Sequence, residues 1–253
     1  MNYGISILSI IPVRLEPNNR SEMTTQLIFG EHFKILESIK KWSKIQISHD
    51  KYVGWISNNQ IQEINFEEYE KLDKEIPTLS TDILDIIESD FNQPIVIGSV
   101  LPTFKSDHAL INNKMYKFTG NTTQGFTQRK HLINNAMVFL NAPYLWGGRT
   151  PFGIDCSGFT QIIYRLQGIK IPRDAYQQIN LGQEINLDNC EEGDLAFFEN
   201  KSGKITHVGL ILENNKIIHA SGQVRIDKLD EKGIFNSEKQ KYSHKLHSIK
   251  KLI

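Results

Sequence analysis

Short runs of alternating apolar and polar residues fill the first quarter of the chain. The segments 32–39, 42–48 and 52–57 are rich in β-branched and aromatic residues, and the turn-forming sequence SHDK separates the last two. Short strands at such close spacing are typical of a small β-barrel. The pattern therefore predicts a β-barrel domain over residues 1–64.

The next two segments have different patterns. Residues 65–77 carry acidic and basic side chains at helical spacing and end at Pro77, which predicts a short linker helix. Residues 78–126 again contain strand-like runs with turn residues between them. We expect this part to form a second, degenerate β-barrel, with an irregular subdomain as the alternative.

From residue 127 onward the apolar positions recur at helical spacing. One helix is predicted by the stripe Leu132, Ile133, Ala136, Met137 and Leu140, and a second helix by the stripe Phe159, Ile162, Ile163 and Leu166. Strand-like segments follow at 194–199, 207–213 and 216–221. Helices followed by antiparallel strands indicate an α+β domain over residues 127–253.

Charge and hydropathy exclude several classes of partner. The chain has 253 residues with 29 basic and 29 acidic side chains, so its formal net charge is zero. This balance gives no electrostatic basis for binding nucleic acid or an anionic membrane. The apolar segment 5–13 has no basic residue before it and no small-residue cleavage site, so it does not resemble a signal peptide. We therefore expect a cytoplasmic protein, with a trimmed or unusual export signal as the alternative.

The chain contains only two cysteines, Cys156 and Cys190. A disulfide between them is possible, but we interpret both as free thiols, and they are too few for a zinc site of their own. Cys156 falls at the predicted start of the second helix, where backbone N–H groups and the helix dipole favour an anion and lower the pKa of a thiol. A catalytic thiolate is one interpretation, and a buried cysteine that packs as a small apolar residue is the other.

Two histidines on neighbouring predicted strands favour catalysis. A papain-like site needs a cysteine at a helix start, a histidine on a strand and a third polar group that orients this histidine. A two-residue turn at Asn214 and Asn215 would point His207 and His219 to opposite faces of the sheet. A three-residue loop would instead pair His219 with Gly209 and bring both rings to one face. The catalytic interpretation therefore predicts the longer loop.

These motifs, taken together, resemble a known family. The sequences YLWGG, GIDCSGF, IPRDAYQQ, GDLAFF, HVGLIL and IIHAS are similar to those of the NlpC/P60 family of bacterial cell-wall cysteine peptidases, over about residues 127–253. Upstream, FGEHFKILE, KWSKIQI and KYVGWIS resemble a bacterial SH3-like domain. The whole chain looks like the γ-D-glutamyl-L-diamino-acid endopeptidases that carry tandem SH3-like domains.

The resemblance implies a papain-like fold and a reaction. Cys156 would be the nucleophile, His207 the general base, and His219 a neutral acceptor for the Nδ1 proton of His207. The bond cleaved would join D-Glu, through its γ-carboxyl group, to meso-diaminopimelate or lysine in murein peptides with a free N-terminal L-Ala. Such peptides are recycling products of the cell wall. We expect a monomer that needs no cofactor and no metal.

The resemblance also implies substrate contacts. Asp155 and Ser157 would bind the substrate amine, although a helix N-cap is an equally good role for Asp155. Tyr144 would contact the substrate or the oxyanion. From the first domain, Tyr52 would close the amine end of the site and Glu22 would supply a further carboxylate.

Two other classes of function remain open at this point. One is a non-catalytic peptidoglycan-binding protein with a decayed peptidase domain, which the presence of all three expected catalytic residues argues against. The other is a thiol amidase or acyltransferase on the same fold. The side chains flanking the expected nucleophile favour the peptidase. Arg173 could bind a substrate carboxylate, with a structural ion pair as its alternative.

Overall fold

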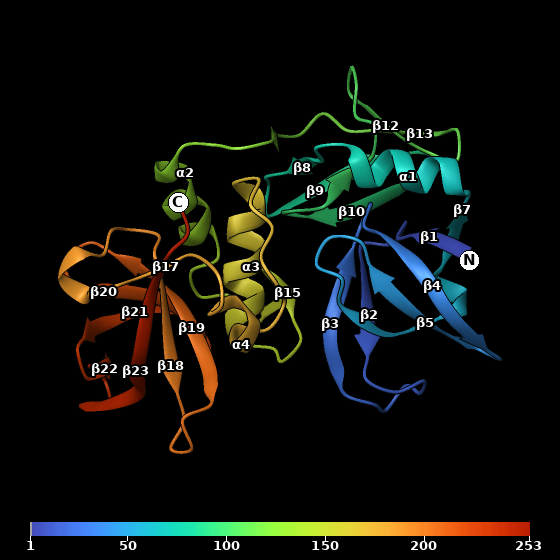
Figure 1. Ribbon diagram of the computed structural model, residues 1–253. Helices are drawn as coiled ribbons and strands as arrows, with labels where there is room; N and C mark the ends of the chain where they lie inside the picture. The colour runs from blue at the N-terminus through green and yellow to red at the C-terminus, as the bar shows by residue number, and fades with distance from the viewer. Residues whose placement is uncertain (1) are drawn as a thin grey trace. The chain divides into compact units, whose positions relative to one another are not determined.

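Figure 1 shows the computed structural model, which describes residues 2–253. The chain divides into two compact units, with the boundary between Phe126 and Thr127. The first unit consists mainly of β-strands, and the second combines helices with an antiparallel sheet. Among the described residues, no helix combines the length and hydrophobicity that a membrane-spanning segment needs.

The first unit begins with a seven-stranded antiparallel sheet in the order β3-β2-β6-β5-β4-β1-β7. The strands that we predicted from alternating residues are present as β4, β5 and β6, so the SH3-like expectation for this region is confirmed. The elements of this part are β1 (Asn2–Ile5), β2 (Ile10–Arg14), β3 (Met23–Ile28), β4 (His32–Ile39), β5 (Trp42–Ile47), β6 (Val53–Ser57), η1 (Asn58–Gln60) and β7 (Gln62–Ile64).

Helix α1 (Phe66–Lys74) connects this sheet to the rest of the first unit. Asn65 caps the helix, because its side chain accepts a hydrogen bond from the Glu68 N–H at 2.8 Å. Two smaller sheets follow, in the orders β10-β9-β13-β12 and β11-β8-β14. Their strands are β8 (Thr78–Ser80), β9 (Leu84–Glu88), β10 (Asn92–Val96), β11 (Val100–Leu101), β12 (His108–Ile111), β13 (Lys114–Lys117) and β14 (Thr122–Gln124).

The first sheet has a hydrophobic core of its own, and a second cluster connects the sheet to the rest of the first unit. This second cluster joins Phe29 beside the first sheet, Tyr69 and Leu72 of α1, and Ile95 and Phe118 of the following segment. Apolar side chains that meet in one cluster leave water together, and this burial binds the segments into one folding unit. Helix α1 is therefore part of the packed core as well as a connection between sheets.

The second unit is a helical layer on a barrel. Strands β18 to β22 pair in sequence, and β23 pairs with both β18 and β22, so these six strands close into a barrel with β17 added outside β23. Its elements are α2 (Arg129–Val138), β15 (Arg149–Thr150), β16 (Gly153–Ile154), α3 (Cys156–Leu166), α4 (Ala175–Gln178), β17 (Gln183–Ile185), η2 (Leu187–Asn189), β18 (Leu195–Glu199), β19 (Ile205–Leu212), β20 (Lys216–Ser221), β21 (Gln223–Asp230), β22 (Gly233–Asn236) and β23 (Lys241–Lys251).

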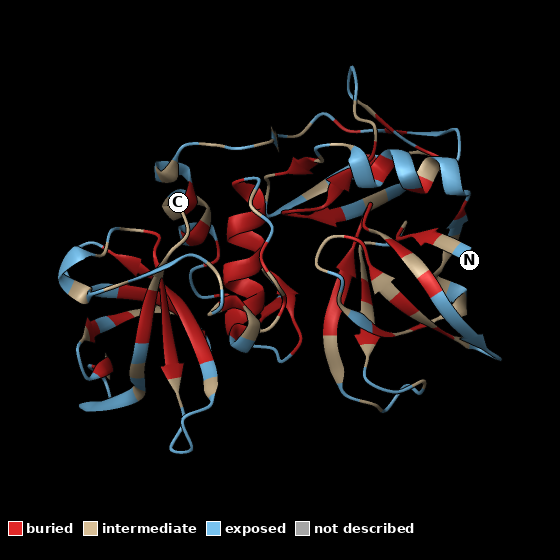
Figure 2. Ribbon diagram, in the orientation of Figure 1, coloured by how far each residue is buried: buried red, intermediate tan, exposed pale blue. Residues whose placement is uncertain are grey.

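Helix α3 lies at the centre of the second unit. Every one of its residues is buried, and it packs against β19, β20, α2 and α4 (Figure 2). A helix that is enclosed on all sides has a fixed position and axis, so its first residue is held rigidly. The predicted α+β fold is confirmed, and the first residue of this helix is Cys156.

The predicted apolar stripe of α2 is partly wrong. Met137 and Leu140 are exposed, whereas Phe139 is fully buried against Phe159, with the ring centres 5.9 Å apart. The helix ends at Val138, and the chain then tightens into a turn that rotates the side chains after it. The turn therefore breaks the helical spacing at Leu140, whereas Met137 is still inside the helix and is exposed there.

A buried ion pair holds the N-terminus of α2 to the start of β18. The Asp194 carboxylate is completely buried and pairs with the Arg129 guanidinium. The same guanidinium donates to the backbone oxygens of Glu192 at 2.6 Å and Ile253 at 2.8 Å. Asp194 of the GDLAFF motif therefore has a structural role. Together with Arg129, it links α2, the start of β18 and Ile253.

We expect Arg129→Met to lower the free energy of unfolding by about 3–5 kcal/mol, because it leaves the buried Asp194 charge without its partner. The matched control is Glu191→Gln, which removes the exposed partner of the same arginine. It should cost less than about 1 kcal/mol. Urea denaturation followed by circular dichroism measures both. Equal losses in the two variants would contradict a special role for the buried pair.

Candidate active site

Cys156 is the first residue of α3 and is 6% exposed. Asp155 precedes it as the N-cap, and its carboxylate accepts hydrogen bonds from the N–H groups of Gly158 at 2.7 Å and Gly147 at 2.8 Å. These bonds satisfy N–H groups that have no partner inside the helix. The cap therefore fixes both the start of the helix and the turn that leads into it.

Arg173 completes a buried ionic cluster beside the cysteine. Its guanidinium donates to both carboxylate oxygens of Asp155, at 2.6 and 3.0 Å, and to the Ser157 hydroxyl at 2.9 Å. Arg173 and Asp155 are 1% and 6% exposed, so this forked pair lies in a low dielectric. The structural ion pair that we gave as the alternative for Arg173 is therefore present. It holds the two residues that flank Cys156.

The predicted low pKa of the thiol is not supported. Burial, followed by the negative charge of Asp155, raises the pKa of Cys156 to about 12. The backbone N–H of Val208, the Arg173 charge and the backbone N–H of Ser157 act in the opposite direction but are weaker. The helix start does favour the anion, as we argued from the sequence, but burial outweighs it. The resting thiol is thus protonated.

The hairpin that carries the two histidines has the longer loop. Leu212 pairs with Lys216, so three residues separate β19 from β20, and the register continues to bring His219 opposite Gly209. A side chain at Gly209 would meet the His219 Cβ at 2.8 Å, so glycine permits this close approach. The prediction of a three-residue loop with both rings on one face is confirmed.

The two histidines form the first links of a hydrogen-bonded chain. His207 Nε2 lies 2.8 Å from His219 Nδ1, and His219 Nε2 lies 3.1 Å from a carboxylate oxygen of Asp227. Because the ionised Asp227 accepts from Nε2, His219 presents its Nδ1 lone pair to the Nε2–H of His207. This tautomer leaves the Nδ1 lone pair of His207 as the base. Our expectation that His219 accepts the Nδ1 proton was wrong, since the contact is made by Nε2.

Burial keeps both of these histidines neutral. Burial, followed by the charges of His219 and His244, holds the pKa of His207 well below its usual range. Burial also lowers the pKa of His219, although the hydrogen bond to Asp227 works against it. His207 is therefore a neutral base at physiological pH, as a general base must be.

Asp227 was missed by the sequence analysis. Burial alone would raise its pKa, but hydrogen bonds from His219 and Arg225 hold the pKa below its ordinary value. In the hairpin of β20 and β21, Ile217 pairs with Asp227 and His219 with Arg225. Asp227 is thus a diagonal neighbour of His219 on the same face. The single glycine between the two strands was the available signal for this register.

A third histidine joins the cluster. His244 of β23 stacks on His207, with ring centres 4.0 Å apart and planes inclined by 20°. Ring nitrogens of the three histidines lie within 4.8 Å of one another, which raises the question of a metal. Zinc needs lone pairs that converge at 2.0–2.1 Å, whereas His207 and His219 share a proton across 2.8 Å and the stacked rings direct their lone pairs along nearly parallel planes. This arrangement does not fit a tetrahedral site.

The predicted substrate-binding residues lie in both units. Tyr144 is 36% exposed, and burial together with the charges of Cys156 and Asp155 raises its pKa to about 12, so its hydroxyl remains a hydrogen-bond donor. Tyr52 lies just before β6 and packs against the core of the first sheet. Glu22 is exposed and lies just before β3. Roles for these three side chains stay predictions.

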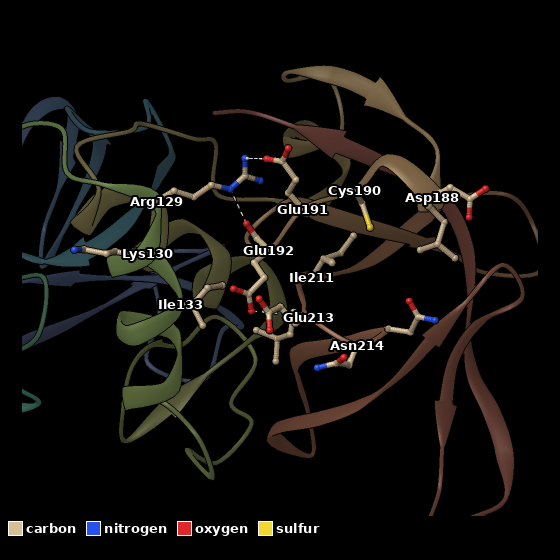
Figure 3. Close-up of a pocket in the computed structure, with 13 residues that line it drawn as sticks. Arg129, Lys130, Ile133, Asp188, Cys190, Glu191, Glu192, Ile211, Glu213 and Asn214 are labelled. Carbon is tan, nitrogen blue, oxygen red and sulfur yellow. Dashed lines mark hydrogen bonds and ion pairs between the residues drawn. The ribbon is translucent and has the colours of Figure 1, made fainter.

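A pocket of about 740 Å³ lies at the far end of β19 from His207 (Figure 3). Its lining includes Cys190, Arg129 and the turn residue Asn214. Both cysteines are free, and among the described residues that line this pocket there is no histidine that could act as a base for Cys190. Burial raises the pKa of Cys190. We therefore interpret Cys190 as chemically inert.

The raised pKa of Cys156 predicts slow alkylation. In a Cys190→Ser chain, the rate with iodoacetamide at pH 7 should be less than about a tenth of that of free cysteine, because only the thiolate reacts. The rate should rise continuously to pH 10. The same protein in urea serves as the control and should regain the rate of an ordinary thiol. A plateau of fast alkylation below pH 7 would show that the resting site stores a thiolate.

Comparison with known proteins agrees with this geometry. Residues 141–242 match the NlpC/P60 family, and residues 13–61 match the bacterial dipeptidyl-peptidase SH3 domain. A gamma-D-glutamyl-L-lysine dipeptidyl-peptidase of Bacillus cereus is 28% identical over 228 residues, which is 80% of this chain and 68% of that protein. Dipeptidyl-peptidase 6 of Lysinibacillus sphaericus is 28% identical over 258 residues, which is 90% of this chain and 92% of that protein.

A solved structure extends the likeness to the whole fold. The crystal structure of an NlpC/P60 family protein from Bacillus cereus superposes with a TM-score of 0.83, covers 99% of both chains and is 20% identical in sequence. At that identity the likeness concerns the fold alone. The sequence matches agree with a site in which the Cys156 thiol contacts the backbone N–H of Val208, the residue next to His207. The chain therefore combines an NlpC/P60 domain with a bacterial dipeptidyl-peptidase SH3 domain, and it is a cysteine peptidase.

Proposed function

We propose that this peptidase cleaves murein peptides between γ-D-Glu and a diamino acid, and that it requires a free N-terminal L-Ala. The observation that carries the proposal is the buried series from His207 through His219 to Asp227, together with a thiol at a helix start that contacts the backbone N–H of Val208, next to His207. The names of the relatives in Bacillus cereus and Lysinibacillus sphaericus support the substrate class. A free amine marks a peptide already released from the wall, so we also propose a role in recycling, in the cytoplasm.

The first half of the reaction forms a thioester. Cys156 Sγ attacks the carbonyl carbon of the scissile bond while its proton passes to Nδ1 of His207. The negative charge moves to the carbonyl oxygen. When the tetrahedral intermediate collapses, the carbon–nitrogen bond breaks and His207 returns the proton to the leaving amine of the diamino acid. The L-Ala-γ-D-Glu group remains bound to the sulfur as an acyl-enzyme.

The second half consumes one water molecule. His207 takes a proton from the water as its oxygen attacks the thioester carbon, and the carbon–sulfur bond then breaks. The proton on His207 returns to the departing sulfur, which restores the neutral thiol. Throughout, His219 holds the His207 ring by its Nε2–H, and Asp227 stabilises the positive charge that His207 acquires. The products are L-Ala-D-Glu and the remainder that begins with the diamino acid.

Substrate recognition is assigned to the residues around the thiol. We propose that Ser157 and Asp155 present oxygen acceptors to the substrate amine, with Arg173 holding both in place. Tyr144 donates its hydroxyl proton to the substrate or to the oxyanion. An acylated amine carries no charge, so this set of acceptors would discriminate against it.

The proposal is tested with paired peptides. Free L-Ala-γ-D-Glu-diamino acid should be cleaved with a kcat/KM about ten- to a hundredfold higher than its N-acetylated form, because the charged hydrogen bonds to the amine are lost on acylation. Mass spectrometry of the products identifies the bond, and meso-diaminopimelate and lysine versions compare the two diamino acids. Cys156→Ala should cleave neither peptide.

Each other outcome points to a different interpretation. Equal cleavage of the two forms would leave a peptidase but overturn the free-amine requirement. Binding without cleavage by the wild-type chain would favour the non-catalytic peptidoglycan-binding protein. Transfer of the acyl group to an added amine in place of water would favour the acyltransferase.

The role of Asp227 gives a second test. We expect Asp227→Asn to lower kcat about ten- to a hundredfold with little change in KM, because the residue acts on His219 and does not reach the substrate. The matched control is Glu238→Gln, which removes the exposed partner of Arg225 and should leave kcat unchanged. An unchanged kcat in Asp227→Asn would show that the chain ends functionally at His219.

A further inference from the structure

His244 covers one face of the ring that we propose as the general base. The ring centres of His244 and His207 are 4.0 Å apart with an interplanar angle of 20°, which is a stacked geometry. Phe198 flanks both rings at 5.8 and 6.0 Å. The hydrogen bond to His219 fixes only one edge of His207, so the ring could still tilt about that bond. The stacked neighbour blocks this tilt.

The backbone around His244 is shaped to aim its ring. In the pairing of β22 with β23, the register shifts so that His244 opposes Ile234 while Tyr242 opposes Phe235, which leaves Ser243 as the extra residue of a bulge. Bulges re-aim side chains and occur next to active sites. Gly233 permits the tight packing here, because a side chain there would collide with the His244 carbonyl oxygen at 1.8 Å.

A hydrogen bond also selects the tautomer of His244. The Ser243 hydroxyl donates to the Ile234 carbonyl at 3.3 Å, so it accepts from the His244 Nδ1–H at 2.9 Å. The ring is thereby tied on the edge that faces its own strand. The flat face of the His244 ring lies against His207. The bulge at Ser243, the glycine at position 233 and the hydroxyl of Ser243 together hold the ring in this orientation.

The titratable groups that face His244 come from three other strands. They are His207 of β19, His219 of β20 and Asp227 of β21. Burial lowers the pKa of His244 to about 4, and the positive form of His219 lowers it too, whereas Asp227 acts to raise it. His244 therefore presents a neutral π face at the pH at which the reaction would run.

We propose that His244 is a positioning residue that fixes the His207 ring and stabilises His207 once it has become an imidazolium. The inference rests on the proposed function, in which His207 takes the proton of Cys156. A cation over a neutral aromatic face is stabilised by the electrons of the ring, most strongly away from water. The stack stabilises the charged intermediate more than the neutral resting base, which is the requirement for catalysis.

The test compares substitutions at His244 in a Cys190→Ser chain, where Cys156 is the single thiol. His244→Phe keeps an aromatic face, and His244→Leu keeps apolar bulk without one. His247→Leu is the control, because this histidine lies on the same strand but is exposed and reaches Glu199 at 3.9 Å. Two readouts are used, kcat/KM on the free-amine peptide and the alkylation rate of Cys156. Thermal unfolding confirms that each variant folds.

We expect His244→Leu to lower both rates about three- to thirtyfold, which is the range of a cation–π contact. His244→Phe should stay within about twofold of the Cys190→Ser parent, since it keeps the aromatic face. Recovery of both rates in His244→Phe but not in His244→Leu is the outcome that a role in filling space alone would not give.

The inference fails if the leucine and phenylalanine variants behave alike, or if the leucine variant equals its parent while folding normally. Failure of the proposed function is distinguished separately. If the wild-type chain cleaves no peptide, the substrate assignment falls. The alkylation rate of Cys156 in the His244 variants would then still show whether the basicity of His207 depends on the aromatic face of His244.

Discussion

The hydrogen bond between His207 and His219 depends on the register of every strand around it. Both rings share a face because a three-residue loop joins β19 to β20. His219 accepts from His207 only because Asp227, set by the next hairpin, takes its other nitrogen. Strands β22 and β23 then close the sheet into a barrel. A shift in the register of one strand would therefore require every other strand of the barrel to shift as well. The closed barrel thus acts as a rigid frame for a proton-carrying chain.

A buried ion pair between Asp155 and Arg173 holds the start of α3, where Cys156 lies. Burying Asp155 and Arg173 removes both from water, which is costly unless their hydrogen bonds are satisfied. The forked contact and the two backbone N–H groups on the carboxylate meet this need. The cluster fixes the start of α3, but it also sets a carboxylate beside the thiol. Precise placement of Cys156 is therefore obtained together with an environment that opposes its ionisation.

The sequence predicted those parts of the site that depend on local pattern. Strand alternation and the spacing of the loop placed His207 and His219 together, and the apolar stripe placed Cys156 at a helix start. Asp227 and His244 escaped because their positions depend on hairpin registers and a bulge. No periodicity encodes these features. The pKa of the thiol was misjudged for a similar reason, because burial is a property of the packed helix as a whole.

A neutral thiol beside a neutral imidazole changes what the site has to provide. A stored thiolate–imidazolium pair would stabilise the resting state as well as the transition state and gain little rate. In the proposed reaction, charge arises only when the substrate carbonyl arrives, so every group that stabilises an imidazolium would act on the transition state alone. Asp227 would do so through the hydrogen bonds to His219 and His207, and the face of His244 would do so across the stack. Burial makes the thiol inert at rest. The same burial keeps water from weakening the hydrogen bonds to Asp227 and the stack on His244, so these contacts would be strong during the reaction.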